Sequence, residues 1–442
     1  MMERLIITGA GSEMQGVGRL ADGRAVFVPG ALPGEEVEIE ITRDAGRFCE
    51  ATLLRVLAPS PMRAESPCPV YSRCGGCSAR HMTYAYTLEL KRQRVFDALK
   101  RIGGIEQPQV LETIGSACTQ RMRNKAEYAV QVKQGKTTIG SYAPRSRQIV
   151  PLTDCLLQKE PSVHALQWLG ENLARYPFAG QIRYLVTRVN RAGQLAMVLS
   201  GDAPIQAALR QHSAEFFAAL PELISLHFCR LKPRPAHALD GECSLTCGSD
   251  TMQDTLLGLR FELSPQSFFQ VNPEQTEILY TKALEAAMPN GSLDHRILDV
   301  YCGAGTITLA AAERASFAVG VELVPPAIEN ARRNAKMNGL EKKTRFICGD
   351  AAREIPRLIA SGERFGAAII DPPRKGADER VLGAMAHAGL PRIAYVSCNP
   401  STLARDVKFL AAQGYRLEWA QPVDMFPWSE HVETVASLVK ES

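Results

Sequence analysis

From residue 263 onward, apolar runs alternate with helical patterns, and this alternation constrains the fold of the 442-residue chain more than any other feature. The runs occur in RILDVYCGAG, AVGVEL, RFICGD, GAAIIDPP and RIAYVSCNP. Strands that alternate with helices form parallel sheets with right-handed crossovers, and such sheets bind ligands at the carboxyl ends of their strands. We therefore expect a Rossmann-like α/β domain whose site lies along one edge of its sheet.

Polar residues follow four of these runs. The first run ends in the turn GAG at residues 303–305, whose glycines let the backbone pass close to a ligand. The run lacks the third glycine of a dinucleotide fingerprint, since Thr308 stands at that position. A helix-packing turn would also explain the two glycines without any ligand. The second and third runs end at Glu322 and Asp350, which suit a ribose and an adenine amino group. The fourth run ends in DPPR at 371–374, a turn that favours S-adenosylmethionine over a nicotinamide cofactor.

The fifth run delivers Cys398 to the same edge. A single cysteine is more often a core thiol, but this one follows four strand ends that carry polar groups. Carbon 5 of uracil is a poor nucleophile, so its methylation requires a thiolate to add at carbon 6. The proton left on carbon 5 must then be removed by a general base. Glu433 is the candidate base, and a solvated acid at a strand edge is the alternative interpretation of this residue.

The DPPR turn also narrows the choice of the nucleobase that is methylated. Enzymes that methylate an exocyclic amino group usually place an aromatic residue after the two prolines, where this chain has Arg374. Cytosine-5 enzymes characteristically keep a cysteine in this turn or beside it, and the turn contains none. Uracil is therefore the base that fits best.

The N-terminal half has a different pattern. Residues 1–57 contain short alternating runs separated by glycine-rich turns, which predicts a small β-barrel. A proline-rich linker follows, and the segment from Tyr84 to Gly103 has the pattern of an amphipathic helix. Residues 118–262 consist mostly of strand-like runs, so we expect a mixed or β-rich central domain there.

Positive charge is concentrated in one segment. Residues 58–160 contain 16 Lys plus Arg against 8 Asp plus Glu, whereas the whole chain carries a net charge of only +4. Clustered positive charge indicates nucleic-acid binding, with a solvated basic surface as the alternative. No apolar run approaches the roughly 18 residues needed to span a bilayer, and no signal-peptide pattern is present. We expect a cytoplasmic protein that does not bind membranes.

Twelve cysteines in a cytoplasmic chain indicate metal or catalytic sites rather than disulfides. Cys68, Cys74 and Cys77 form a C-x5-C-x2-C set, and Cys155 can supply a fourth thiolate. Four thiolates suit zinc as well as an iron-sulfur cluster, so spacing alone leaves the metal open.

With these motifs, essentially the whole chain resembles the RNA (uracil-5)-methyltransferase family, in particular its RumA-like, iron-sulfur-containing 23S ribosomal RNA branch. The resemblance implies that residues 1–57 form a TRAM domain, an RNA-binding barrel of OB type. It implies a central domain of residues 58–84 and 118–262 that holds a 4Fe-4S cluster. Residues 85–117 and 263–442 would form the S-adenosylmethionine-dependent catalytic domain, so the early helix should pack on that domain.

The same resemblance assigns roles to individual residues. Cys398 in VSCNPSTLARD matches the nucleophile, and Glu433 in HVETVASL matches the base. Thr306 departs from the asparagine that several members have beside the methionine end of the cofactor. The four cysteines named above match the cluster ligands. The expected cofactor-binding residues are Gln270, Tyr301, Gly303, Gly305, Thr306, Glu322, Asp350 and Asp371, and the expected substrate-binding residues are Phe268 and Arg374.

The tRNA branch of the family lacks both the barrel and the cysteine set, so the resemblance favours 23S ribosomal RNA as the substrate. A tRNA uracil methylase and a non-catalytic RNA-binding protein are the two competing hypotheses. The presence of both Cys398 and Glu433 argues against the second. No obligate protein partner is expected.

Overall fold

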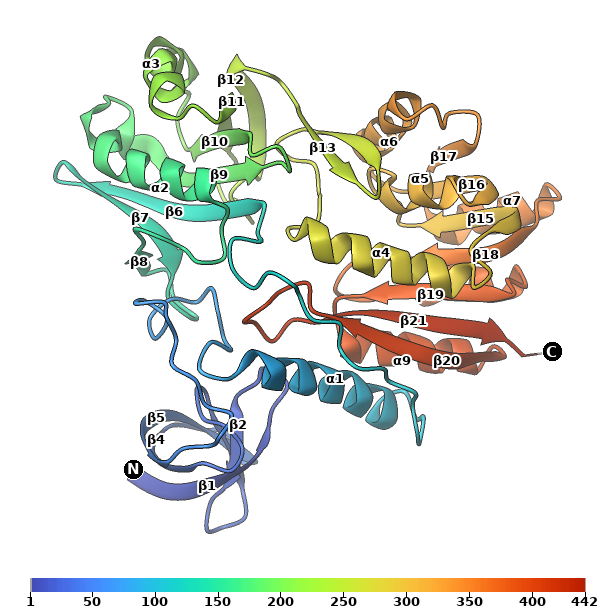
Figure 1. Cartoon of the computed structure of the whole chain (residues 1–442), viewed down its shortest axis with the longest axis horizontal. Coiled ribbons are helices and arrows are strands. Elements are labelled where there is room, and N and C mark those ends of the chain that lie inside the picture. Colours follow the sequence, from blue (N-terminus) through green and yellow to red (C-terminus); the bar gives the residue numbers. More distant parts are fainter. Residues whose placement is uncertain (1, 442) are drawn as a thin grey trace.

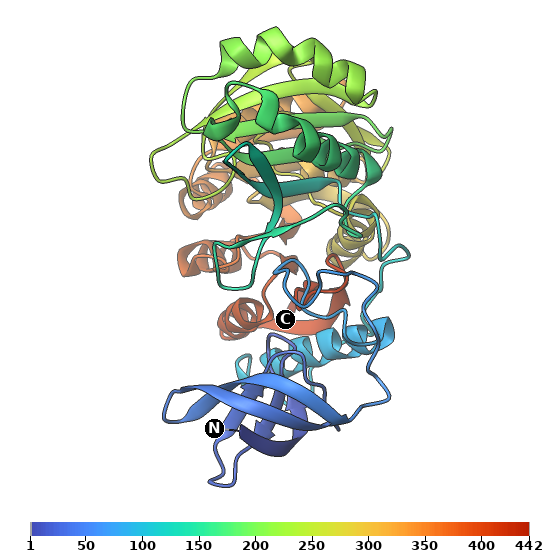
Figure 2. The ribbon, with the colours of Figure 1, turned by 90° about the vertical axis from the view of Figure 1, so that its left-hand side faces the viewer.

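The structure is a computed structural model that describes residues 2–441. It has a barrel, a central sheet and a C-terminal sheet flanked by helices, and the two sheets have seven strands each (Figure 1). Figure 2 shows the central part above the barrel, with the C-terminal part behind them. Within the described residues, no helix is long and apolar enough to cross a membrane.

The barrel is closed, with the strand order β1-β2-β3-β5-β4. Alternate side chains of its strands point inward, and Ile7, Val26, Val37 and Ile39 are fully buried at its centre. The predicted N-terminal barrel is thereby confirmed. Its strands are β1 (Met2–Ala10), β2 (Gly16–Arg19), β3 (Ala25–Val28), β4 (Glu36–Asp44) and β5 (Phe48–Ala58).

The central sheet has seven strands in the order β12-β11-β10-β9-β6-β7-β8. Only β10 and β11 pair in parallel, so this sheet is largely antiparallel. The β-rich content was predicted, whereas the direction of the strands was not. Helices α2 and α3 pack on it. Its elements are β6 (Lys125–Lys133), β7 (Lys136–Tyr142), β8 (Ile149–Pro151), α2 (Glu160–Asn172), η1 (Leu173–Arg175), η2 (Ala179–Gln181), β9 (Ile182–Val189), β10 (Leu195–Gly201), α3 (Gln206–Ala219), β11 (Leu223–Leu231) and β12 (Gly241–Gly248).

The C-terminal sheet has the order β17-β16-β15-β18-β19-β21-β20. The first five strands in this order are parallel, whereas β21 runs antiparallel between β19 and β20. The predicted Rossmann-like fold is confirmed. Its elements are α4 (Pro273–Ala287), β15 (Leu293–Val300), α5 (Thr306–Ala312), β16 (Ala315–Glu322), α6 (Pro325–Met337), β17 (Thr344–Cys348), α7 (Ala351–Ala360), β18 (Phe365–Ile370), α8 (Glu379–His387), β19 (Arg392–Ser397), α9 (Pro400–Ala411), β20 (Tyr415–Val423) and β21 (Glu433–Lys440).

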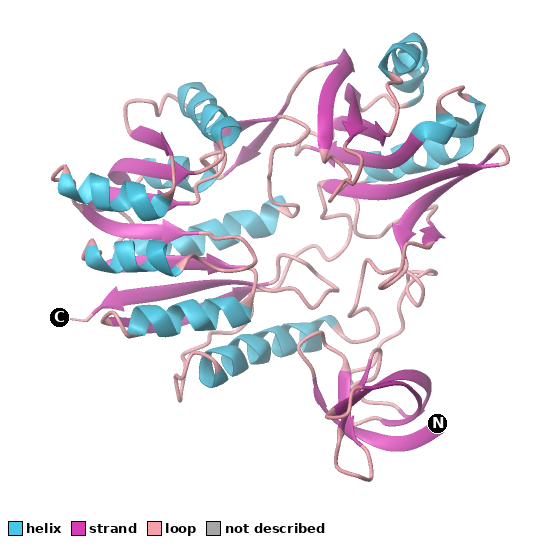
Figure 3. Ribbon diagram, turned by 180° about the vertical axis from the view of Figure 1, so that it is seen from behind, coloured by secondary structure: helices cyan, strands magenta, loops and turns pink. Residues whose placement is uncertain are grey.

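Helices cover both faces of this sheet. One face packs against α4, α5 and α6, and a short hairpin of β13 (Met252–Leu256) and β14 (Leu259–Leu263) leads into it. The other face packs against α7, α8, α9 and α1 (Tyr84–Arg101), which lie in a row in Figure 3. Helix α1 thus joins the C-terminal sheet although it precedes the central sheet in sequence. The exact domain boundaries remain a prediction.

Candidate functional site

A cavity of about 1090 Å³ lies at the carboxyl ends of the parallel strands. The residues that follow β15, β16, β17 and β18 all reach it, as expected for an open α/β sheet. Its volume is at the upper end of the range for small-molecule sites. Eight of the predicted residues line it, namely Phe268, Gln270, Tyr301, Gly303, Thr306, Glu322, Asp350 and Asp371.

The turn after β15 has left-handed backbone at Tyr301, Gly303 and Gly305, with φ of 65°, 54° and 82°. A Cβ atom on Gly303 would meet nothing within 4 Å, which leaves open space on the cavity side. A Cβ atom on Gly305 would lie 3.0 Å from the Ala331 side chain and the Phe346 ring. Gly305 therefore lies behind the turn and serves packing. It was predicted to bind the cofactor, but it does not line the cavity.

Two carboxylates at the cavity are oriented by backbone amides. The Gly303 and Val324 N–H groups donate to Glu322, at 3.2 and 2.9 Å. Asp350 accepts a hydrogen bond of 3.0 Å from the Ala352 N–H and so caps α7. These bonds hold both acids in place at the cavity wall.

The cavity also has residues that sequence reasoning missed. Tyr280 of α4 lines it, and the Thr306 hydroxyl lies 3.5 Å from the Tyr280 hydroxyl. Lys375, Arg380 and Arg405 give another part of its wall positive charge. In the sequence, Lys375 and Arg380 follow the DPP turn and Arg405 follows the fifth apolar run. The sequence pattern does not indicate that these three residues lie together.

Asp299 is a second missed feature. It is buried in β15, and burial raises the pKa of its carboxyl to about 7. The Thr308 hydroxyl donates to it at 2.5 Å. This bond explains why Thr308, rather than a third glycine, follows the turn. The signal was an acid inside the apolar run ILDV.

Cys398 and Glu433 meet through the antiparallel pairing of β19 with β21. Ser397 lies opposite Thr434, so Cys398 follows the last paired residue of β19 at the level of Glu433. Glu433 is 4% exposed, and Cys398 is partly buried. Neither side chain lines the large cavity itself.

Charges around this pair shift its titration. Burial raises the pKa of Glu433 to about 8, the Asp371 carboxylate adds to this rise and Arg374 opposes it. Burial and Glu433 raise the pKa of the Cys398 thiol to about 11, which Arg374 again opposes. Partial burial raises the pKa of Asp371 to about 7. Arg374, exposed and outside the cavity lining, therefore favours the ionised form of both groups.

The four cysteines of the predicted metal site come together. Cys68, Cys74, Cys77 and Cys155 line one cavity of about 340 Å³. Among residues 2–441, however, no group of three or more His, Cys, Asp or Glu side chains is arranged to hold a single metal ion. The arrangement of the described side chains therefore does not support the predicted 4Fe-4S cluster.

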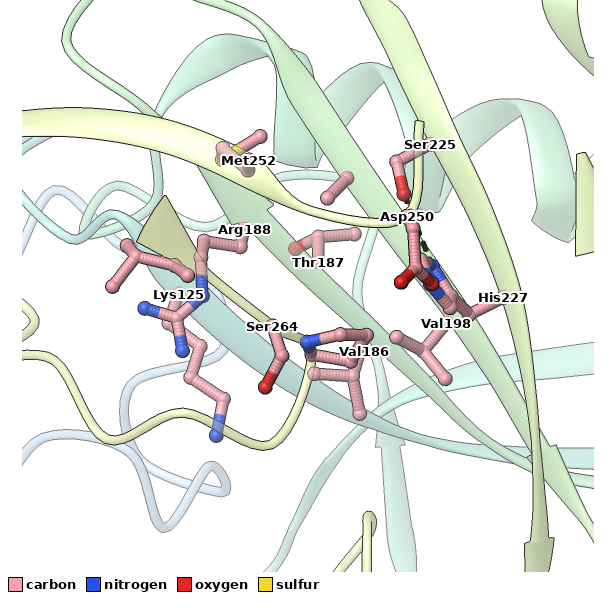
Figure 4. Close-up of a pocket in the computed structure, with 13 residues that line it drawn as sticks. Lys125, Val186, Thr187, Arg188, Val198, Ser225, His227, Asp250, Met252 and Ser264 are labelled. Atoms are coloured by element: carbon pink, nitrogen blue, oxygen red, sulfur yellow. Dashed lines mark hydrogen bonds and ion pairs between the residues drawn. The ribbon is translucent and has the colours of Figure 1, made fainter. Parts of the chain in front are cut away.

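A smaller cavity of about 20 Å³ lies between the central sheet and the segment after β14 (Figure 4). Ser225, His227 and Asp250 at one end resemble a hydrolase triad, with Ser225 Oγ 3.0 Å from His227 Nδ1. The Ser225 side chain is buried and donates to the Ser249 carbonyl at 2.7 Å. The cavity has room for about one water molecule, so this arrangement does not support hydrolysis.

Comparisons with known proteins agree with this geometry. A family model described as tRNA (Uracil-5-)-methyltransferase matches residues 250–441, and a TRAM domain model matches residues 3–54. Uncharacterized RNA methyltransferases of Clostridium tetani and Caldanaerobacter subterraneus are 38% and 41% identical to the chain. The first match covers 98% of this chain and 95% of the relative, and the second covers 97% and 96%.

A solved structure has the same architecture. It is the Pyrococcus abyssi tRNA (uracil-54, C5)-methyltransferase in complex with S-adenosyl-L-homocysteine. It aligns with a TM-score of 0.77 at 25% identity over 99% of both chains. The family expected from the motifs is confirmed, and the chain belongs to the S-adenosylmethionine-dependent RNA (uracil-5-)-methyltransferases.

Proposed function

We propose that the protein methylates carbon 5 of a uridine in RNA, with Cys398 as the nucleophile and Glu433 as the general base. The observation that carries this proposal is the strand register that sets Cys398 at the level of Glu433 beside the large cavity. Methylation of carbon 5 requires a thiol and a carboxyl. The thiol activates the ring by adding at carbon 6, and the carboxyl removes the proton from carbon 5 after methyl transfer.

The reaction follows from these groups. The Cys398 thiolate adds at carbon 6 of the uracil and turns carbon 5 into an enolate carbon. S-adenosylmethionine bound in the large cavity would supply the electrophilic methyl group, and the electrons of the broken S–C bond would stay on its sulfur. The Glu433 carboxylate then takes the proton from carbon 5, and the electrons of that C–H bond restore the double bond as the Cys398 sulfur leaves. Arg374 assists the first step because its charge favours the thiolate.

The large cavity suits S-adenosylmethionine. Glu322 and Asp350 project from neighbouring strand ends with their carboxylates oriented, and Gly303 leaves space for close approach of the ligand. Gln270, Tyr301, Thr306 and Asp371 complete the proposed cofactor contacts, whereas Gly305 acts through packing. Phe268 is 77% exposed at the cavity, a position in which an aromatic ring can stack on a splayed base.

We also propose that the four cysteines hold a 4Fe-4S cluster. Cys68, Cys74, Cys77 and Cys155 line one cavity and would supply the four thiolates that such a cluster needs. The cavity fits an anionic group, because Arg80 Nη2 and Arg123 Nε at its wall have no hydrogen-bond partner among the described residues. The methylation chemistry has no redox step, so the cluster would serve structure or RNA positioning.

The barrel does not distinguish a ribosomal RNA enzyme from a tRNA enzyme, contrary to what the resemblance implied. The barrel and the cysteine set were expected to separate ribosomal RNA enzymes from tRNA enzymes. The Pyrococcus abyssi tRNA enzyme nevertheless matches 99% of this chain, barrel included. Domain content therefore does not discriminate. The cysteine set alone supports 23S ribosomal RNA, which we keep as the proposed substrate of this cytoplasmic enzyme, and tRNA is the second candidate.

Mapping of 5-methyluridine tests the proposal. Ribosomal RNA and tRNA from a deletion strain should be compared with RNA from the same strain carrying either the parental gene or Cys398→Ala. A 23S position that is methylated only with the parental gene supports the proposal. A change confined to tRNA makes the protein a tRNA enzyme, and no change in either RNA contradicts methylation of these substrates.

A further inference from the structure

The loop between β20 and β21 ends at Glu433 and is fixed by residues from the distant start of the chain. At its beginning, Asp424 forms a buried ion pair with Lys91 of α1 and accepts a 2.7 Å hydrogen bond from the Tyr84 hydroxyl. Near its end, the Arg94 guanidinium donates to the Glu430 carbonyl at 2.7 Å. The loop is therefore held at both ends by one helix.

The second half of the loop is also held by the segment that follows Cys77. The Ser78 hydroxyl donates to Glu430 Oε2 at 2.5 Å, and the Glu430 N–H donates back to Ser78 Oγ at 3.0 Å. We call this reciprocal pair the Ser78 clamp. The Ser78 and Ala79 N–H groups also donate to the Trp428 carbonyl, at 3.0 and 3.1 Å.

Trp428 shows that these contacts determine the path of the loop. Its backbone has φ of 66°, a left-handed conformation that is strained for a residue other than glycine. The Trp428 indole N–H donates to the Thr119 carbonyl at 2.9 Å, and the Arg80 guanidinium lies 5.1 Å from the centre of the ring. A loop without these partners would relax away from this conformation.

We infer that Ser78 is a positioning residue for the reaction, because its clamp on Glu430 sets where the loop delivers Glu433, three residues farther on. The inference rests on the proposed role of Glu433 as the base. Ser78 does not touch the cavity and is outside the residues that line it. Its loss should therefore affect proton removal from carbon 5 rather than the binding of cofactor or RNA.

The test uses Ser78→Ala in the full-length protein, with total RNA from a deletion strain as substrate. A misplaced base slows only the step after methyl transfer, so a covalent protein–RNA adduct that survives denaturing gels should accumulate. Turnover should fall on the order of tenfold, because displacement of a catalytic group by a fraction of an ångström has effects of this size. The Kd for S-adenosylmethionine and for RNA should stay within about twofold of the parental values.

Three further variants make the result decisive. Ser78→Thr keeps the hydroxyl and should restore turnover without adduct. Ser213→Ala removes another hydroxyl, one that donates to the Arg210 carbonyl in α3, and should resemble the parent. Glu433→Gln should trap the adduct most strongly. Adduct with Glu433→Gln but none with Ser78→Ala overturns the inference alone, whereas no adduct with Glu433→Gln overturns the base assignment and the inference together.

Discussion

Lys91 and Asp424 lie 333 positions apart in sequence and form an ion pair in which both side chains are fully buried. Lys91 Nζ also donates to the Phe426 carbonyl at 3.0 Å, and the Tyr84 hydroxyl donates to the other Asp424 oxygen. The pair joins α1 to the loop that leads to Glu433. Burial of each charge is costly, and the fold tolerates it only while each charge keeps its partner.

Lys91→Met should therefore destabilise the protein by about 3 to 5 kcal/mol, because it leaves the Asp424 carboxylate buried without its cation. The double variant Lys91→Met with Asp424→Leu should recover most of this loss. Thermal unfolding of the two variants and the parent measures the difference. Equal loss in the single and double variants would show that the pair is not the source of the effect.

Cys398→Ala should abolish methylation rather than slow it, since carbon 5 has no other route to nucleophilic character. The residues around the cavity that we assign to the cofactor do not include the thiol, so S-adenosylmethionine should bind with near-parental affinity. RNA binding should also persist, because phosphate contacts dominate affinity. Calorimetric titrations beside a methyl-incorporation assay check all three points, and appreciable methylation would mean that another residue is the nucleophile.

The two glycines of the turn after β15 should respond differently to alanine. Gly305→Ala places a Cβ atom 3.0 Å from Ala331 and Phe346 and should cost about 2 kcal/mol of stability. Gly303→Ala meets no atom within 4 Å, so only its backbone strain of about 1 kcal/mol remains. Its main effect should be weaker S-adenosylmethionine binding. Melting temperatures and cofactor Kd values for both variants separate packing from ligand contact.

Protein purified without oxygen should be brown and contain about four irons and four sulfides per chain, because four cysteine thiolates line one cavity. Cys155→Ser should lower the iron content, whereas Cys348→Ser, at an exposed cysteine outside that cavity, should leave it unchanged. Iron and sulfide assays with the visible spectrum measure this. Stoichiometric zinc in oxygen-protected protein would contradict the cluster.

Much of the sheet and cavity could be predicted, because strand ends in an open α/β fold follow from local pattern. Glu322, Asp350 and Asp371 each end an apolar run, and parallel pairing brings such ends together. The meeting of Cys398 with Glu433 could not be derived in this way. It depends on the position of β21 between β19 and β20 in the sheet, and the alternation of apolar and polar residues in the sequence does not indicate this strand order. The Ser78 clamp joins residues 352 positions apart and was invisible for the same reason.

Glu433 should make the stability of the protein depend on pH. The pKa of an exposed glutamate is about 4.3, whereas burial raises the pKa of Glu433 to about 8. Between these values the folded protein binds more protons than the unfolded chain, so stability falls as the pH rises. Its contribution is fully present below about pH 4.3 and is lost through pH 8.

Between pH 6 and pH 8 the loss should be on the order of 2 kcal/mol for the parent and much smaller for Glu433→Gln, which does not ionise. Asp299 and Asp371 titrate in both proteins, so the difference between the two pH profiles reports Glu433 together with its interaction with Asp371. The exposed Glu341→Gln is the matched control and should follow the parent. Melting curves recorded at half-unit steps provide the measurement. Parallel profiles for the parent and Glu433→Gln would mean that Glu433 ionises in the fold as easily as in water. A carboxylate of that kind is a weak base, so the match between the pKa of Glu433 and neutral pH would no longer support its role in removing the carbon-5 proton.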